Sequence, residues 1–322
     1  MRRYSFRTPA ERLGAIVKRR DFIARGAAAA AAAAAAPLGP VAASAVPEAP
    51  PANAFHLHFA PGFGQFKAHA GPDLTAQIDF AASQGFTAMF DNGIMGRPPA
   101  EQELIARELS RRGMRLGPFV LYADFAAKSF VLRDQDVRAM LRQKMRDGVE
   151  AMQRVGAKQA LVVLGRLDES LAWDYQTANA VDHLRACMEV CEPAGLVLVL
   201  EPLNPKDHPG LFLTRIPQAY QICKAVASPS CKIIDDLYHQ QITEGNLIPN
   251  IEAAWDEIAA FHIGDNPGRK EPTTGEINYR NVFRRIRDKG YQGVLCMEHG
   301  QSQPGIEGER AVIDAYRTCD PS

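Results

Sequence analysis

Residues 196–204 read LVLVLEPLN, and this stretch indicates the fold. Five apolar residues in a row, without polar alternation, are typical of a strand buried on both faces, as in a parallel sheet covered by helices. The strand then ends in Glu201, followed by Pro202. An ionised carboxylate at the end of such a strand is unfavourable unless another group compensates its charge.

Seven further stretches share this strand character, and helical periodicity separates most of them. The expected strands are Phe55–Phe59, Thr87–Phe90, Arg115–Tyr122, Gln159–Leu164, Leu196–Glu201, Lys232–Asp236, Ala259–Ile263 and Val294–Glu298. The expected helices are Leu74–Gln84, Ala100–Arg112, Asp134–Val155, Tyr175–Ala194, Ile216–Ala227, Tyr279–Lys289 and Glu307–Tyr316. Five of these helices are followed at once by a glycine, the residue that most readily ends a helix: Gly85, Gly113, Gly156, Gly195 and Gly290.

Eight strand–helix units over residues 55–318 predict an α/β fold, a single-domain (β/α)8 TIM barrel. An open, doubly wound sheet is the alternative. It is disfavoured because no Gly-x-Gly-x-x-Gly motif follows the first strand.

Four consecutive strands of this barrel end in metal-ligating side chains. They deliver Glu201, either Asp235 or Asp236, His262 and Glu298 to the rim where barrel enzymes keep their working residues. Alternation alone does not choose between the two aspartates, since a slip of one residue reverses the faces of a strand. Each residue alone could be structural, but four on adjacent strands favour a function. Three crowded carboxylates with one imidazole predict one divalent ion, Mg²⁺, Mn²⁺ or Co²⁺.

The first 45 residues differ in composition from the rest. They carry eight basic residues against two acidic ones, then ten alanines over Ala27–Ala36, and then Ala43-Ser44-Ala45 as a small-residue cleavage site. Lys18-Arg19-Arg20-Asp21-Phe22-Ile23 resembles a twin-arginine export motif. The alternative is a basic, alanine-rich helix or arm. We expect a signal peptide over 1–45, a proline-rich linker over 46–54, and a periplasmic protein with no stable membrane anchor after cleavage.

Removing this leader changes the charge balance of the chain. The whole sequence has 37 basic and 37 acidic residues, so 29 basic and 35 acidic residues remain, a net charge near −6. An acidic domain argues against a nucleic-acid partner, which requires a basic surface. The six cysteines form no CxxC pair, and we expect them to be buried apolar residues.

Several motifs resemble the hydroxypyruvate isomerase family, within the wider xylose isomerase-like barrel superfamily of sugar phosphate isomerases and epimerases. They lie at residues 200–210, 236–241, 265–279 and 290–293, and the resemblance is strongest from residue 196 to 300. It implies a metal held by Glu201, Asp236, His262 and Glu298, with Asp236 preferred because it begins an Asp-x-x-His motif. It further implies that Glu201 and Glu298 act as the acid/base pair, and that His239 and Arg269 hold substrate oxygens. Asn204 and His58 are added as candidate substrate-binding residues.

The implied activity is aldose–ketose isomerisation, or epimerisation, of a small hydroxy-keto acid or sugar. A divalent ion bridging the carbonyl and hydroxyl oxygens would stabilise an enediolate while the two glutamates move the proton. The segments 55–58, 91–93 and 122–128 depart from the family pattern, so the resemblance does not identify the substrate. It also leaves open whether the protein forms a homo-oligomer. His56 and His58 share a strand face. Either could line the mouth of the barrel, but a role in the core or in supporting the site residues is favoured.

Three other functions compete with this one. A paired-carboxylate glycosidase would use two acids and leave Asp236 and His262 without a role. A three-zinc phosphodiesterase needs more histidine ligands than the eight in the chain supply. An exported, non-catalytic sugar-acid-binding barrel would keep the pocket without turnover, although it has no need of both glutamates.

Overall fold

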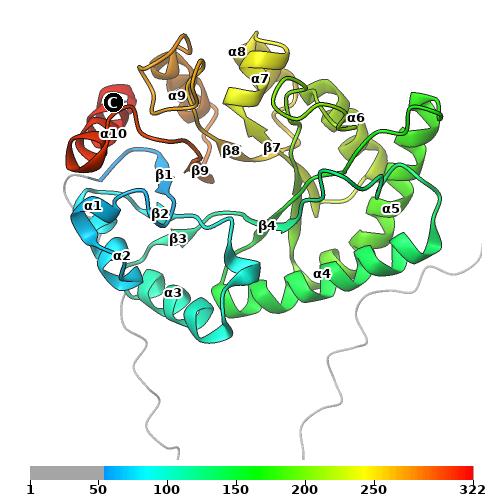
Figure 1. Cartoon of the computed structure of the whole chain (residues 1–322), viewed down its shortest axis with the longest axis horizontal. Helices are drawn as coiled ribbons and strands as arrows, with labels where there is room; N and C mark the ends of the chain where they lie inside the picture. Colours follow the sequence, from blue (N-terminus) through cyan, green and yellow to red (C-terminus); the bar gives the residue numbers. More distant parts are fainter. Residues whose placement is uncertain (1–53, 322) are drawn as a thin grey trace, which may run out of the picture. The chain divides into compact units, whose positions relative to one another are not determined.

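The computed structural model describes residues 54–321, which form a (β/α)8 barrel, as predicted (Figure 1). The expected signal peptide and almost all of the expected linker lie outside the described residues. The strands are β1 His58–Pro61, β2 Ala88–Met89, β3 Arg115–Leu116, β4 Phe119–Tyr122, β5 Gln159–Val162, β6 Val197–Leu200, β7 Cys231–Asp236, β8 Ile258–His262 and β9 Val294–Met297.

All the strand pairs are parallel, and the first strand lies beside the last. The main sheet has the order β1-β9-β8-β7-β6-β5-β4, with His58 opposite Val294 and Pro61 opposite Met297. A second pair, β2 and β3, lies between β1 and β4 in the ring, and the Phe90 amide donates to the Pro61 carbonyl at 3.2 Å. Pairing of the first strand with the last closes a sheet into a barrel.

The strand predicted over 115–122 is interrupted at Gly117-Pro118, so it becomes β3 and β4. Proline lacks the amide hydrogen that a strand ladder requires. Gly117 is needed for space, because a Cβ at this position would lie 3.0 Å from the Cys296 sulfur and 3.1 Å from the Phe90 Cβ.

The helices surround the strands in Figure 1. They are α1 Lys67–Ala70, α2 Leu74–Ser83, α3 Pro99–Arg111, α4 Gln135–Val155, α5 Trp173–Ala194, α6 Ile216–Val226, α7 Leu237–Thr243, α8 Leu247–Ala253, α9 Tyr279–Asp288 and α10 Gly305–Cys319, with a 3₁₀ turn at Ile94–Gly96. All seven predicted helices are present. The five glycines that follow them have φ between +64° and +87°, as left-handed helix ends require. None of the helices within residues 54–321 is long and apolar enough to cross a membrane.

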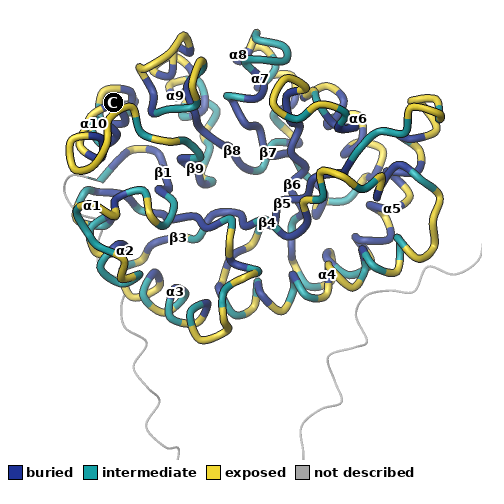
Figure 2. Tube along the Cα trace, in the orientation of Figure 1, coloured by how far each residue is buried: buried dark blue, intermediate teal, exposed yellow. Residues whose placement is uncertain are grey.

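The buried residues form one large outer layer and two smaller clusters inside the barrel. The outer layer joins helix residues such as Ile78 to strand residues such as Leu200, Phe261 and Met297. The inner clusters include Leu161, Val199, Ile234 and Ala260 on one side, and Ala60, Ala88, Phe90, Val294 and Cys296 on the other. Figure 2 shows most of the strands dark as buried segments, with exposed positions on the outer helices. The six cysteines are buried and free, as expected.

Candidate metal centre

Strand alternation turns four ligand side chains into the barrel mouth. Val199, Ile234, Ala260 and Cys296 belong to the inner clusters, and side chains two residues apart share a strand face. Counting two residues onward from each gives Glu201, Asp236, His262 and Glu298. The structure therefore brings together the four metal ligands predicted from the sequence.

The ligand atoms of these four residues lie within 4.8 Å of one another. The Nδ1 atom of His262 is 3.1 Å from Oε1 of Glu201, 2.9 Å from Oε2 of Glu298 and 3.8 Å from Oδ2 of Asp236. Within residues 54–321 no other group of three or more His, Cys, Asp or Glu side chains is close enough to hold a metal. Three carboxylate oxygens and one imidazole nitrogen around a common point fit a hard or borderline divalent cation.

The charges of this cluster perturb its pKa values. Burial would lower the pKa of His262, but the carboxylates of Glu298 and Glu201 raise it well above its ordinary value. Burial raises the pKa of Glu201 to about 7, against the opposing hydrogen bond from His262. For Glu298, burial acts in the same direction but is outweighed by His262 and Arg269, which hold its pKa well below the usual range. Shifts in opposite directions, caused by burial and by closely placed opposite charges, mark this cluster as a candidate functional site.

The two aspartates of β7 have different surroundings. Oδ1 of Asp236 accepts hydrogen bonds from the amides of Tyr238 and His239, and so caps α7, while Oδ2 faces the other ligands. Asp235 is also buried, but it lies one residue out of phase with the inner face. Burial raises the pKa of Asp235 to about 8, and its Oδ1 has no hydrogen-bond partner among residues 54–321. Asp236 is therefore the aspartate at the centre.

Arg269 reaches the same carboxylates from the loop after β8. Its Nη2 lies 2.7 Å from Oδ2 of Asp236 and 2.6 Å from Oε2 of Glu298, and its Nε donates to the Glu298 carbonyl oxygen at 3.1 Å. The guanidinium also lies 4.9 Å from the ring centroid of Tyr238, a cation–π contact. One face of the cluster is thus occupied by a fixed positive charge suited to oxygen atoms.

His239 is held in a defined tautomer beside the ligands. Its Nδ1 lies 2.6 Å from the Asn204 side-chain nitrogen and 3.3 Å from the Asn204 amide nitrogen, both of which carry donor hydrogens. Nδ1 therefore accepts, and the ring proton lies on Nε2, which is 3.7 Å from Oδ2 of Asp236. Burial lowers the pKa of His239, which favours this neutral form.

Not every predicted residue lies at the centre. His58 is the first residue of β1, at the opposite end of the strand from the rim, and its Nδ1 lies 2.7 Å from the Thr87 hydroxyl. The structure does not bring His58 to the site. Nor does it bring His56, which is paired with Asp320 at 2.9 Å.

The sequence analysis missed Asn92, whose side-chain nitrogen donates to Oε1 of Glu298. Its signal was position: it lies three residues after the end of β2, on the same rim as the ligands. Asp207, for which the sequence left a substrate contact and a solvated loop position equally open, accepts hydrogen bonds through its carboxylate from the Tyr238 hydroxyl at 2.8 Å and the Asn204 side chain at 3.0 Å.

Comparison with known proteins finds isomerases among the relatives of this chain. The chain is 33% identical over 179 residues to the hydroxypyruvate isomerase of Escherichia coli (strain K12), covering 54% of this chain and 69% of that enzyme. It is 32% identical over 122 residues to the 2-oxo-tetronate isomerase of Cupriavidus necator, covering 38% of this chain but only 47% of the relative. These named homologues support an isomerase.

The fold has its own counterparts among solved structures. An Escherichia coli 3-keto-D-glucoside 4-epimerase superposes with a TM-score of 0.68 over 82% of this chain and 100% of that one, at 19% identity. The family model described as "Xylose isomerase-like TIM barrel" matches residues 77–319. On this match the chain belongs to the xylose isomerase-like TIM barrel family.

Proposed function

We propose that this protein is a metal-dependent isomerase or epimerase of a small hydroxy-carbonyl acid or sugar, similar to hydroxypyruvate isomerase. The observation that carries the proposal is the convergence of Glu201 and Glu298 on one atom, Nδ1 of His262, at 3.1 and 2.9 Å. Two glutamates from β6 and β9 thereby flank a common point from different strands. A reaction that takes a proton from one carbon and returns it to a neighbouring carbon, or to the opposite face, can use such a pair.

The donor set supports a single divalent ion, Mg²⁺, Mn²⁺ or Co²⁺, held by Glu201, Asp236, His262 and Glu298. The carboxylates of this cluster already attract two cationic side chains, the imidazole of His262 and the guanidinium of Arg269. Their negative charge is the charge that a bound divalent ion would neutralise. When bound, the ion would act as a Lewis acid that polarises a carbonyl and favours loss of a proton from the adjacent carbon.

The glutamates would move the proton. Glu298 is kept ionised by His262 and Arg269, whereas burial raises the pKa of Glu201 to about 7. Two carboxylates whose pKa values are pushed apart are suited to acid and base roles. Either can remove a substrate proton while the other, or the same one, returns it.

Arg269 and His239 would hold the substrate oxygens. The guanidinium of Arg269, whose Nε and Nη2 donate to Glu298 and Asp236, brings a positive charge that attracts a carboxylate or hydroxyl oxygen of the substrate. His239 offers its Nε2 proton, because Asn204 supplies the donors to Nδ1. Asn204 thus acts through His239 in this proposal.

The test is proton exchange in D2O with Mn²⁺ or Mg²⁺, using hydroxypyruvate, 2-oxo-tetronate and free ketoses as substrates. Glu201→Gln and Glu298→Gln are each expected to lower solvent-deuterium incorporation by about 10² or more. Glu169→Gln, at an exposed position in the loop after β5, is the matched control and should exchange like the parent protein. Exchange that persists in both active-site variants would refute the acid/base assignment.

The same experiment separates the competing functions. Binding of sugar acids without any exchange would indicate a non-catalytic binding barrel, and hydrolysis that survives chelation would indicate a glycosidase. A three-zinc phosphodiesterase has little support, because the ligand cluster within residues 54–321 contains one histidine.

We propose further that residues 1–45 direct export by the twin-arginine route, so that the barrel works in the periplasm. The support is compositional: a basic segment with an Arg-Arg pair, an alanine run and a small-residue cleavage site, in that order. Replacing Arg19 and Arg20 by lysine should retain the protein in the cytoplasm, as measured by cell fractionation. Unchanged periplasmic recovery would contradict the route.

A further inference from the structure

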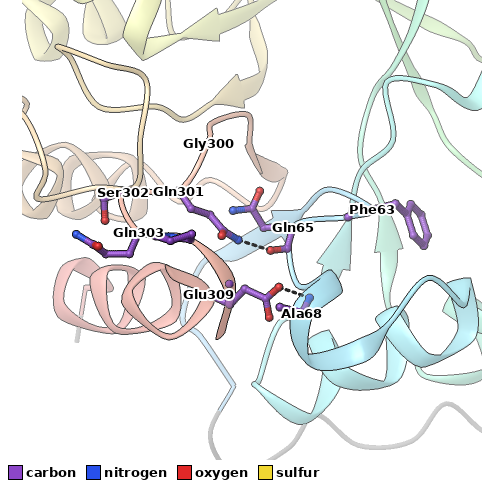
Figure 3. Close-up of a pocket in the computed structure, with 11 residues that line it drawn as sticks. Phe63, Gln65, Ala68, Gly300, Gln301, Ser302, Gln303 and Glu309 are labelled. Atoms are coloured by element: carbon purple, nitrogen blue, oxygen red, sulfur yellow. Dashed lines mark hydrogen bonds between the residues drawn. The ribbon is translucent and has the colours of Figure 1, made fainter. Parts of the chain in front are cut away.

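Side-chain hydrogen bonds join neighbouring loops at the rim of the barrel. The Gln301 side-chain nitrogen donates to the Gln65 carbonyl oxygen at 2.6 Å, which links the loop after β9 to the loop after β1 (Figure 3). Neither of these residues belongs to the candidate metal centre. The loop after β6 is linked to α7 in a different way, because its hydrogen bonds include side chains that lie beside the metal ligands.

The loop after β6 folds into a closed turn that places Asp207. Oδ1 of Asn204 accepts the amide hydrogens of Lys206 and Asp207 at 3.0 and 2.8 Å, and the His208 amide donates to the Asn204 carbonyl oxygen at 3.1 Å. A short polar side chain that accepts from amides further along the chain commonly fixes a turn of this kind. Asn204 is buried and Asp207 is exposed, so the turn is anchored from below.

The carboxylate of Asp207 receives two hydrogen bonds on one oxygen. Its Oδ2 accepts from the Asn204 side-chain nitrogen at 3.0 Å and from the Tyr238 hydroxyl at 2.8 Å. These two donors lower the pKa of Asp207 below its ordinary value, so the group is ionised near neutral pH. Hydrogen bonds to an ionised acceptor are stronger than those between neutral groups.

Each of the two donors also holds a side chain of the candidate site. The second N–H of the Asn204 amide donates to Nδ1 of His239 at 2.6 Å. The ring of Tyr238 lies under the guanidinium of Arg269, with its centroid 4.9 Å from Cζ. One oxygen of Asp207 is thereby connected, through two hydrogen bonds, to both of the side chains that would hold substrate oxygens.

The contact between Tyr238 and Arg269 gains importance when the centre holds an ion. Nη2 of Arg269 contacts Oδ2 of Asp236 and Oε2 of Glu298, the same oxygens that face His262. A divalent ion would compete with the guanidinium for these oxygens. The ring of Tyr238 and the carbonyl oxygen of Glu298 are not subject to this competition, so they are the remaining restraints on Arg269.

We propose that Asp207 is a positioning residue, whose carboxylate holds Arg269 in place through Tyr238 and His239 in place through Asn204. This inference rests on the proposed function for the roles of Arg269 and His239 toward the substrate. Loss of the carboxylate releases the Tyr238 hydroxyl and one N–H of Asn204 together, so both site residues gain freedom from a single change outside the metal ligands.

NMR of the side chains tests the positioning without turnover. Protein labelled with ¹⁵N at arginine and histidine gives the Nε–H signal of Arg269 and the ring signals of His239, which are assigned by their loss in Arg269→Lys and His239→Gln. In Asp207→Ala with excess Mg²⁺, hydrogen exchange of the Arg269 Nε–H with water should become about tenfold faster, the order that corresponds to one hydrogen bond. The Nδ1 signal of His239 should shift toward the average of two tautomers, with or without Mg²⁺.

Steady-state kinetics measure the consequence for the reaction. Asp207→Ala should lower kcat/KM about tenfold on whichever substrate shows proton exchange. Because both donors use the same oxygen, Asp207→Asn keeps an acceptor for each and should stay within about threefold of the parent. Asp182→Ala, which removes an exposed carboxylate from α5, is the matched control and should behave like the parent.

The outcomes separate this inference from the proposed function. Unchanged Arg269 and His239 signals, or an unchanged kcat/KM, in Asp207→Ala would overturn the positioning role. Equal losses in Asp207→Ala and Asp207→Asn would overturn it as well, because the charge and not the pair of hydrogen bonds would then be responsible. A parent protein that exchanges no proton would refute the isomerase alone, and the NMR comparison would still decide the role of Asp207. Melting temperatures equal to the parent's show that the variants are folded.

Discussion

At the scale of single residues, the pairing of Asn204 with His239 makes a direct prediction. Asn204→Ala removes the side-chain donor that holds Nδ1 of His239, and it also removes the acceptor for the Lys206 and Asp207 amides. We expect kcat/KM to fall by about tenfold to a hundredfold, as for other groups that orient a site residue. Steady-state kinetics on whichever substrate shows exchange would measure the loss.

Asn281→Ala is the control for this variant, since Asn281 is exposed on α9. If Asn204→Ala and Asn281→Ala have the same kcat/KM as the parent, the orientation of His239 does not depend on Asn204.

His58 predicts a pH dependence of stability. Burial, and then Arg115, lower the pKa of His58 below its ordinary 6.5 in the folded state. As the pH falls through 6.5 the unfolded chain binds a proton that the folded chain resists, so the free energy of unfolding decreases. In His58→Gln this contribution is absent. The urea midpoint of His58→Gln, relative to that of the parent, should therefore rise as the pH falls from 8 to 5. A constant difference would contradict the lowered pKa.

The residues of the centre were predictable to different degrees. Glu201, His262 and Glu298 were identified because the carboxyl ends of parallel strands meet at one rim. Asp235 and Asp236 could not be separated without the strand register, which the inward position of Ile234 supplies. The distance of Arg269 from the carboxylates could not be predicted, because a long loop of irregular structure positions it.

At the scale of elements, the packing of α4 on the barrel depends on Gly148. A Cβ at Gly148 would lie 2.6 and 2.7 Å from the two methyl carbons of the buried Leu121 in β4. Although alanine is the better helix former, Gly148→Ala should destabilise the protein by about 1–3 kcal/mol through overpacking. Urea unfolding measures the change. Gln143→Ala, exposed on the same helix, should lie within about 0.5 kcal/mol of the parent, and an equal result for both variants would refute the close contact.

The end of α6 offers the opposite change. Ala227 has φ 58° and ψ 41°, a left-handed conformation that costs an alanine about 1–2 kcal/mol. Ala227→Gly should raise the free energy of unfolding by about 0.5–1 kcal/mol, since glycine adopts this conformation freely but also gains freedom in the unfolded chain.

Gly156→Ala is the reciprocal experiment, because Gly156 ends α4 at φ 71° with no atom near enough to obstruct a Cβ. It should destabilise by about 1 kcal/mol. Chemical denaturation of both variants checks the pair, and changes of the same sign would contradict the conformational explanation.

Long elements were predictable and short ones were not. All seven predicted helices have ten or more residues in the structure, enough for their periodicity to be read. The seven-residue helices α7 and α8 were missed, because two turns carry little periodic signal. The break at Gly117-Pro118 was also missed, although both residues are typical of strand interruptions.

At the scale of the whole molecule, binding of a divalent ion should stabilise the barrel. An ion that binds only the folded state contributes about 2.7 kcal/mol when its concentration is 100 times its Kd. For a domain of this size the melting temperature should rise by roughly 5–10 °C with Mn²⁺, and EDTA should reverse the rise. Differential scanning calorimetry of Glu298→Gln provides the comparison. An equal rise in this variant would place the ion elsewhere.

The pairing of β1 with β9 has a consequence for biosynthesis. The four ligands enter the chain in the order of their strands, and Glu298 comes directly after β9, the strand that closes the ring. A nascent chain on the ribosome therefore acquires its final ligand and its final strand in the same few residues. Until they emerge there is neither a closed wall nor a complete coordination shell. If the centre holds a divalent ion as proposed, a half-synthesised chain would lack one of the four ligands, and the ion would bind only after Glu298 has emerged.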